Sequence, residues 1–449
     1  MSKPDETIIR VLADATRDRP SRRRSLLITL PLGVLLLLVL AVLAVEGWRQ
    51  SRINAAEERA MQAMAAIRAD YANVGDWPGW YKSRVKGTRG DAEFRAWVER
   101  ANARHSDTDL SEVLSGLEHR LLGESPEGTP LTDDELRRFI AAAATTAAEL
   151  DEVVVYDGVT GIPPFENGLP AIDVLQQITA IKAMCARCLA LACQGQLDAA
   201  WRDIERLFKL AQRVQDACTL IEFMVNIAIE SLVHQTFQQV CAVSAPPESL
   251  GAYFPWPDAP DRLTEIAELE AVFSAQVMPG ADDLAEYVGD GHSRGWFRWF
   301  DPTESPTNWP DEFTREATAL DEVATYLQAV RELAGMQRGN SGTPPVAHDW
   351  ARNILSKSAA GRARVTAARR GSNLAWDFRT AERQGTPLAA CQPSKLLYSV
   401  RRIETLNDGA VVWTWDLPQA DKVRIAGPYA TLDDLFSETP VLKLFPLDR

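Results

Sequence analysis

An uncharged run of 21 residues near the N-terminus constrains this chain more than any other feature of its sequence. From Ser25 to Val45 the sequence reads SLLITLPLGVLLLLVLAVLAV, without an acidic or basic side chain. A helix rises about 1.5 Å per residue, so a helix of this length crosses the roughly 30 Å hydrocarbon layer of a membrane. Residues 25–45 are therefore predicted to form a single transmembrane helix.

The charges on either side of this run predict its orientation. The arginines on the N-terminal side are Arg10, Arg17, Arg19, Arg22, Arg23 and Arg24. On the other side, acidic residues balance the arginines: Arg49, Arg52 and Arg59 against Glu46, Glu57 and Glu58. The positive-inside rule then predicts a cytoplasmic tail at residues 1–24 and export of everything after Val45. The run is longer than the apolar core of a cleavable signal peptide, about 7–15 residues, so we expect an uncleaved signal anchor, with cleavage after Val42-Leu43-Ala44 as the alternative.

The net charge argues against one class of partner. The chain carries −14 overall, and the seven basic and four acidic residues of positions 1–24 leave −17 on residues 25–449. A surface this acidic repels phosphate backbones. We therefore expect no nucleic-acid binding by the exported body.

Beyond the anchor, apolar residues recur mostly at helical spacing, and the chain is predicted to be mainly α. We expect a single transmembrane helix followed by a helical array of stacked hairpins, with a small C-terminal β-hairpin or sheet. The predicted parts are a membrane-proximal helical region (46–156), a central helical bundle (170–278), a loop rich in Trp, Gly and Pro (279–310), C-terminal helices (311–393) and a small β-rich element (394–449). In the last part, Asn407-Asp408-Gly409 between two β-rich runs predicts a hairpin, and residues 421–427, DKVRIAG, are predicted to add a third strand.

Three helices are predicted in the central bundle, at 171–194, 197–214 and 216–243, with Gly195 ending the first. Around Gly195 the segment Met184–Ala211 resembles a tetratricopeptide-type helical hairpin, on the close-packing residues Cys188, Gly195, Ala200, Ile204 and Leu207. The resemblance implies stacked helical pairs and no particular ligand. The whole layout is similar to membrane-anchored exported proteins of bacteria, which implies the inner membrane with the body in the periplasm.

The segment Gly291-His292-Ser293-Arg294-Gly295 has the letters of a serine-hydrolase nucleophile elbow, G-x-S-x-G. Such an elbow needs a buried strand before it, and the preceding residues DDLAEYVGD carry too many charges for one. The chain also lacks the strand and helix alternation of hydrolase folds. We do not expect Ser293 to be catalytic, and an envelope serine hydrolase remains the first alternative.

The cysteines suggest a second alternative. Cys185 and Cys188 fall on one helix face, with Cys193 two turns further on, which is a possible thiol or metal site. We expect small buried packing residues instead, because redox pairs sit at helix N-termini and no second C-x-x-C is present. If the first and third bundle helices run parallel and adjacent, Cys193 and Cys241 reach similar heights, and they are the preferred pair for a disulfide.

A polar stripe runs along the third bundle helix. Its members recur every four residues: Glu222, Asn226, Glu230, His234 and Gln238. A stripe of this kind can bind a metal or transfer protons. We expect the solvated edge of the helix, because nothing in the sequence supplies ligands that converge from another helix.

Aromatic side chains interleave with one cation in the predicted loop, at Trp296, Phe297, Arg298, Trp299 and Phe300. Exposed aromatic side chains of this kind contact peptides, glycans or membrane interfaces. The alternative is that they pack against the bundle and hold the loop in place as a plug. The predicted function is a non-catalytic, membrane-anchored extracytoplasmic scaffold or adaptor that binds a protein partner in the envelope, without a cofactor or metal. The oligomeric state stays open.

Overall fold

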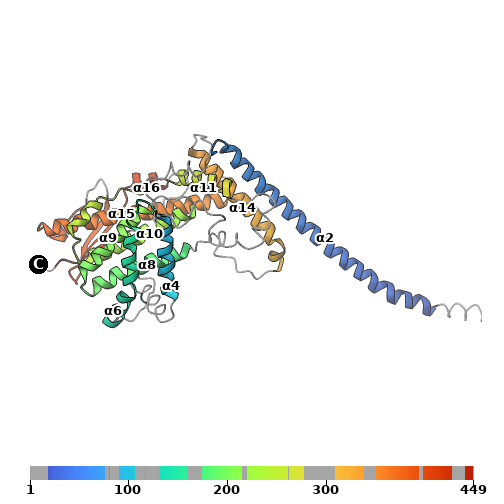
Figure 1. The fold of residues 1–449 in the computed structure, drawn as a ribbon, viewed down its shortest axis with the longest axis horizontal. Coiled ribbons are helices and arrows are strands. Elements are labelled where there is room, and N and C mark those ends of the chain that lie inside the picture. Colours follow the sequence, from blue (N-terminus) through green and yellow to red (C-terminus); the bar gives the residue numbers. More distant parts are fainter. Residues whose placement is uncertain are drawn as a thin grey trace, which may run out of the picture. The chain divides into compact units, whose positions relative to one another are not determined.

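A computed structural model describes most of the chain: residues 19–75, 80, 90–106, 117, 131–159, 174–214, 220–260, 262–277, 309–337, 349–393, 398–426 and 440–447. The chain is mainly helical with a small antiparallel sheet near its C-terminus, as predicted (Figure 1). It divides into two compact units, Met1–Gln62 with Gly280–Ala324, and Ala63–Pro279 with Thr325–Arg449.

The elements keep the labels of Figure 1. The α-helices are α2 (Arg19–Asp70), α4 (Asp91–Ser106), α6 (Asp133–Ala142), α7 (Ala144–Val153), α8 (Val174–Cys193), α9 (Leu197–Arg213), α10 (Leu220–Val243), α11 (Leu263–Val277), α14 (Trp309–Gln337), α15 (Asp349–Arg383) and α16 (Gln419–Ala426). The short 3-10 helices are η1 (Glu248–Tyr253) and η2 (Leu388–Ala390), and the strands are β1 (Ser399–Thr405), β2 (Val411–Asp416) and β3 (Val441–Leu444).

In the first unit, α2 packs on the N-terminal half of α14. The buried side chains of α2 are Ile53, Ala56 and Ala60, and those of α14 are Ala317, Leu320, Val323 and Ala324. Arg59 Nε donates to Asp321 Oδ1 across the pair at 2.9 Å. The predicted uncharged run, 25–45, lies within α2, and its described side chains are Leu40 and those of residues 43–45. Within the part of the chain that the structure describes, no helix is long and apolar enough to cross a membrane.

Two helix ends in the second unit show local stabilisation, the start of α6 at Thr132 and the end of α8 at Gly195. Thr132 caps α6 through its hydroxyl, which accepts from Glu135 N, while the Glu135 carboxylate accepts from Thr132 N. This arrangement is a capping box. Gly195 ends α8 with φ of +69°, a left-handed conformation that glycine adopts without strain. Its N–H and that of Gln196 bond to Ala192 O and Leu191 O, at 3.0 and 2.9 Å.

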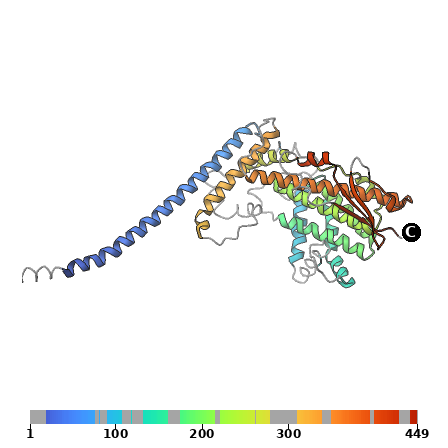
Figure 2. The same ribbon diagram turned by 180° about the vertical axis from the view of Figure 1, so that it is seen from behind.

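Helices α10 and α15 form the central pair of the second unit and run parallel (Figures 1 and 2). The direction follows from contacts that advance together along both helices, from Ile227 near Gly361 to Cys241 near Arg379. A Cβ atom on Gly361 would lie 2.9 Å from the Ile227 Cγ2 atom. Glycine therefore lets the two helices approach closely at this point.

The C-terminal sheet has the strand order β1-β2-β3, antiparallel throughout. The predicted hairpin is confirmed, with Gly409 at φ +81° in its turn. The third strand is β3, whereas the predicted residues 421–427 begin in α16; that expectation was wrong. Two antiparallel strands need further packing to be stable. Trp413 of β2 supplies it by contacting Phe378 of α15, with ring centroids 4.5 Å apart.

Candidate functional site

The polar stripe of α10 is buried, so the expectation of a solvated edge was wrong. Glu222, Asn226, Glu230 and His234 are between 0% and 6% exposed. The covering helix is α15, which begins more than a hundred residues after α10 ends and brings its own polar side chains. We call these facing groups the α10–α15 polar seam: Glu230, His234 and Gln238 on α10, and Arg369, Ser372 and Arg379 on α15.

Glu230 and Arg369 form a buried ion pair at the middle of the seam. Arg369 Nε and Nη2 donate to Glu230 Oε2 at 3.0 and 2.7 Å, and Nη1 donates to Pro257 O at 3.0 Å. The guanidinium carbon also lies 5.6 Å from the centre of the Trp256 ring. Burial raises the pKa of Glu230 above its ordinary value, although the charge of Arg369 and its hydrogen bond act in the opposite direction. The pair thus ties α10, α15 and the chain after η1 at one point.

One turn further along, His234 faces Ser372. Their Nδ1 and Oγ atoms are 3.0 Å apart, and the Ser372 hydroxyl lies 3.3 Å from His234 O, which is a second acceptor for it. Burial lowers the pKa of His234 well below 6.5, and the charge of Arg369 lowers it further, so the imidazole is neutral at pH 7. Neither side chain has exposed surface. The pair is therefore a hydrogen bond between helices and has no opening for a substrate.

At the end of the seam, Arg379 caps α10. Its Nε and Nη2 groups donate to Cys241 O at 2.6 Å and Ala242 O at 2.8 Å, and Glu382 accepts from Nη1. The last carbonyls of a helix have no partner within the helix, and a cation at that end also favours the helix dipole. Arg379 satisfies both requirements while it is fully buried.

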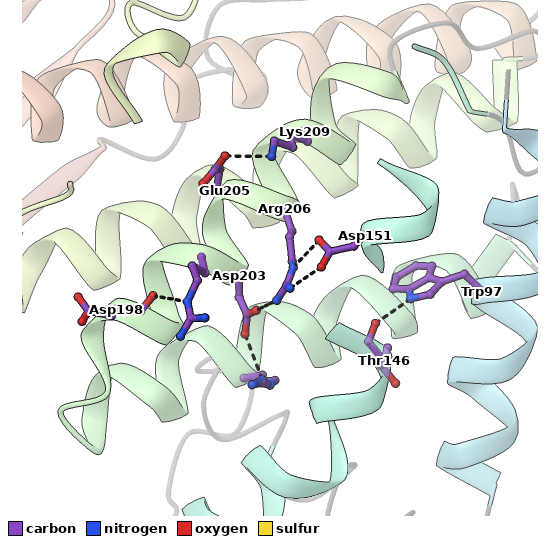
Figure 3. Close-up of polar contacts among 10 residues, drawn as sticks. Trp97, Thr146, Asp151, Asp198, Asp203, Glu205, Arg206 and Lys209 are labelled. Carbon is purple, nitrogen blue, oxygen red and sulfur yellow. Dashed lines mark hydrogen bonds and ion pairs between the residues drawn. The ribbon is translucent and has the colours of Figure 1, made fainter. Parts of the chain in front are cut away.

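A second polar network joins α7, α8 and α9. Buried Asp203 accepts from Arg187 Nη1 at 3.1 Å and from Arg206 Nη1 at 2.7 Å. Figure 3 shows Arg206 between Asp203 and Asp151, to which it donates through Nε at 2.7 Å. Burial raises the pKa of Asp203, whereas the hydrogen bond from Arg206 lowers the pKa of the more exposed Asp151. The network therefore links α9 to its neighbours α7 and α8.

A third group lies where α10, α11 and α14 meet. Glu270 of α11 accepts from Leu220 N at 2.5 Å and from the hydroxyl of Tyr326. Burial, with a smaller contribution from the charge of Glu222, raises the pKa of Glu270 to about 8, although the Leu220 hydrogen bond acts in the opposite direction. Sequence reasoning missed Glu270; its signal is a carboxylate among the buried residues Ile266, Ala267 and Leu269 of α11.

The other predicted site residues divide between described and undescribed parts of the chain. Ser293 and the five residues Trp296, Phe297, Arg298, Trp299 and Phe300 lie outside the described residues. Cys185 and Cys188 are buried in α8, as expected of packing residues, and burial raises the pKa of Cys188 well above 9.0. Among the described residues, no group of three or more His, Cys, Asp or Glu side chains converges to hold a metal.

The predicted disulfide is not formed in the structure, where the Cys193 and Cys241 thiols are both free. Trp201 Nε1 donates to Ser244 Oγ at 3.2 Å, so the C-terminal end of α10 lies beside the N-terminal end of α9, next to the end of α8. This agrees with the parallel arrangement assumed for the pair. Cys193 is exposed whereas Cys241 is buried, and the disulfide stays a prediction.

The central groups of these networks, Glu230, His234, Asp203 and Glu270, share one property: each is buried and makes a hydrogen bond to a neighbouring helix. Buried ionic and polar pairs of this kind fix which helices meet and in what register. Their arrangement supports a role in assembly of the helical body. No protein-family model, curated protein or solved structure matches the chain.

Proposed function

We propose that this protein is a membrane-anchored, extracytoplasmic helical scaffold that binds a protein partner in the bacterial cell envelope. The anchor is residues 25–45 in the inner membrane, with residues 1–24 in the cytoplasm. The observation that carries the proposal is a row of exposed large hydrophobic side chains on α2. Leu40, Leu43, Val45 and Trp48 are between 47% and 61% exposed.

These side chains suit a lipid environment. Leaving a Leu or Val side chain in water rather than burying it costs about 1.5–3 kcal/mol. Trp48 follows the uncharged run directly, and Arg52 lies over its ring at 5.4 Å. Tryptophan and arginine are the residues that gather at the boundary between lipid and water. The end of the run therefore has the side chains expected of a membrane interface.

The scaffold role rests on how the body uses its polar groups. Glu230, His234, Asp203 and Glu270 are buried and engaged between helices. Stacked helices present broad surfaces on which a partner protein can bind. The aromatic residues Trp296–Phe300 are the proposed contact with that partner.

A membrane assay tests the anchor. Leu36→Arg/Leu38→Arg places two charges in the run, and each costs about 2.5–3.5 kcal/mol at the centre of a membrane helix. We expect the full chain to resist carbonate extraction in wild type and to be extracted in this variant. Ala55→Arg, an exposed position beyond the run on the same helix, is the matched control and should behave as wild type. Extraction of the wild-type chain would refute the anchor.

In-cell crosslinking tests the partner. We expect wild type to capture a specific envelope protein and Trp296→Ala/Trp299→Ala to capture much less of it at equal abundance. Equal capture by both proteins would agree with the scaffold function but would show that the aromatic residues do not contact the partner. A wild-type chain that captures nothing specific would contradict the scaffold.

A further inference from the structure

Strand β1 forms one edge of the C-terminal sheet. In the part of the chain that the structure describes, the strand order β1-β2-β3 gives β1 a single neighbour, β2. A register shift between Val400 and Arg402 leaves Arg402–Thr405 as the regular stretch of the strand. Ile403 is 38% exposed, and the side chains of Arg402 and Glu404 are 68% and 42% exposed. A sheet edge that is open to solvent can pair with another strand.

The hydrogen bonds of the hairpin show which backbone groups of β1 face this open edge. Leu406 N donates to Ala410 O at 2.8 Å, so Leu406 directs its backbone groups at the opposite strand. Hydrogen-bonded and non-hydrogen-bonded pairs alternate along an antiparallel ladder, and the register is regular from Arg402 to Thr405. Ile403 and Thr405 therefore direct their N–H and C=O groups away from β2.

We propose that β1 is a homodimer interface. Two copies of this chain pair their β1 strands antiparallel about a twofold axis at Ile403, which places Arg402 of each copy opposite the partner's Glu404 and joins the two sheets into one.

The pattern of charges along β1 selects a second copy of the same strand as its partner. Because the outward-facing backbone groups alternate, two identical antiparallel strands can bond only if one residue faces its own counterpart. An axis at Arg402 or Glu404 would place like charges opposite each other, which is destabilising. An axis at Thr405 would place much of the strand opposite the partner's hairpin turn. With the axis at Ile403, opposite charges face each other on both sides of it.

The side chains on the two faces of the joined edge also fit this axis. Ile403 is paired with Trp413 in the register and shares its face of the sheet, on which Trp413 contacts Phe378. Two facing isoleucines would extend that apolar face. Arg402 and Glu404 lie on the other face and already form an ion pair at 3.0 Å. In the dimer they meet the partner's pair in non-hydrogen-bonded positions, where Cα atoms are about 4.5 Å apart, and the four charges alternate in sign.

A charge swap tests the interface. The measured quantity is the dissociation constant of the full chain in detergent micelles, from sedimentation velocity over a concentration series. We expect wild type to dimerise. Arg402→Glu places two acidic side chains opposite each other at two symmetric positions and should raise the dissociation constant by about tenfold or more. Arg402→Glu/Glu404→Arg restores opposite charges and should return the constant to within about threefold of wild type.

Lys443→Glu is the matched control, because it makes the same change of charge at an exposed position of β3, on the other edge of the sheet, and should dimerise as wild type does. A wild-type chain that stays monomeric would overturn the proposal. An Arg402→Glu variant that dimerises like wild type, or a swapped variant that does not recover, would overturn it as well. If Arg402→Glu does not fold, Glu404→Arg takes its place, because it sets two arginines opposite each other.

The dimer goes beyond the proposed function, since neither the anchor at residues 25–45 nor the aromatic contact with an envelope protein uses β1. A monomeric chain would therefore leave the scaffold untouched, and a chain that carbonate extracts from the membrane would leave the dimer untouched.

Discussion

Replacing Arg369 with methionine tests whether the polar seam holds α10 and α15 together. The substitution keeps an unbranched side chain but removes two hydrogen bonds to Glu230 and one to Pro257 O. Breaking one partner of a buried ion pair costs about 3–5 kcal/mol. Because a backbone carbonyl also loses its donor, we expect the upper part of that range, about 4–5 kcal/mol.

We expect the loss of stability to come from the buried Glu230 carboxylate that is left without its partner, and not from the loss of attraction between the two charges. Two measurements separate these causes. Removing both charges, in Arg369→Met/Glu230→Leu, should recover most of the stability, because no buried charge is left without a partner. The single variant should also depend on pH. The pKa of Glu230 is already raised by burial and rises further without Arg369. A group with a raised pKa in the folded protein gives stability at low pH that is lost as the pH rises, so Arg369→Met should be least stable at neutral and higher pH.

Urea unfolding of the full chain in detergent micelles, followed by tryptophan fluorescence, measures these free energies, and hydrogen exchange in α10 and α15 locates the loss. Arg364→Met is the matched control, because Arg364 is exposed on the same helix. It should change stability by about 0.5 kcal/mol or less. The reasoning fails if Arg369→Met costs less than about 1 kcal/mol, or if the double variant loses as much as the two single variants together.

Three further predictions concern caps and thiols. Thr132→Ala removes the capping box and should cost about 1 kcal/mol, with faster hydrogen exchange in α6; unchanged exchange would contradict a role for the cap. Gly195→Ala should destabilise the protein by about 1 kcal/mol in a urea titration, because its φ is +69° and no neighbouring atom opposes the new methyl group; a neutral or stabilising result would be inconsistent with this backbone. Maleimide should label exposed Cys193 in the native protein and buried Cys241 only after unfolding. If the predicted disulfide forms after export, neither thiol reacts until a reductant is added.

The sequence was informative wherever a local rule decides the structure. The end of α8 at Gly195 and the hairpin at Gly409 both follow from glycine's access to positive φ, which needs no knowledge of distant residues. The wrong prediction of a strand at residues 421–427 also came from a local sequence pattern. Alternating apolar residues in DKVRIAG suit a strand, but no partner strand was specified, and residues 421–426 form the end of α16 instead.

The candidate site was beyond local rules. Glu230 and His234 repeat at helical spacing, which shows that they share a face but not what covers it. Their partners Arg369 and Ser372 lie more than 130 residues away, and only the packing of α15 brings them close. Nothing in the spacing of the α15 arginines indicates which of them pairs with a buried carboxylate of α10.

The arrangement of the seam explains why α10 carries polar residues at positions where apolar residues could be buried at a lower cost in free energy. A shift of α15 by one turn, about 5.4 Å, would separate Arg369 from Glu230 and move Val365 to the place of Gly361 against Ile227. There a Cβ atom already lies within 2.9 Å of the isoleucine, so a branched side chain does not fit. The ion pair and the glycine therefore select the same register by independent means, one by attraction and one by exclusion. This is why an apolar double variant at Glu230 and Arg369 should stay stable and still keep the register, through the glycine alone.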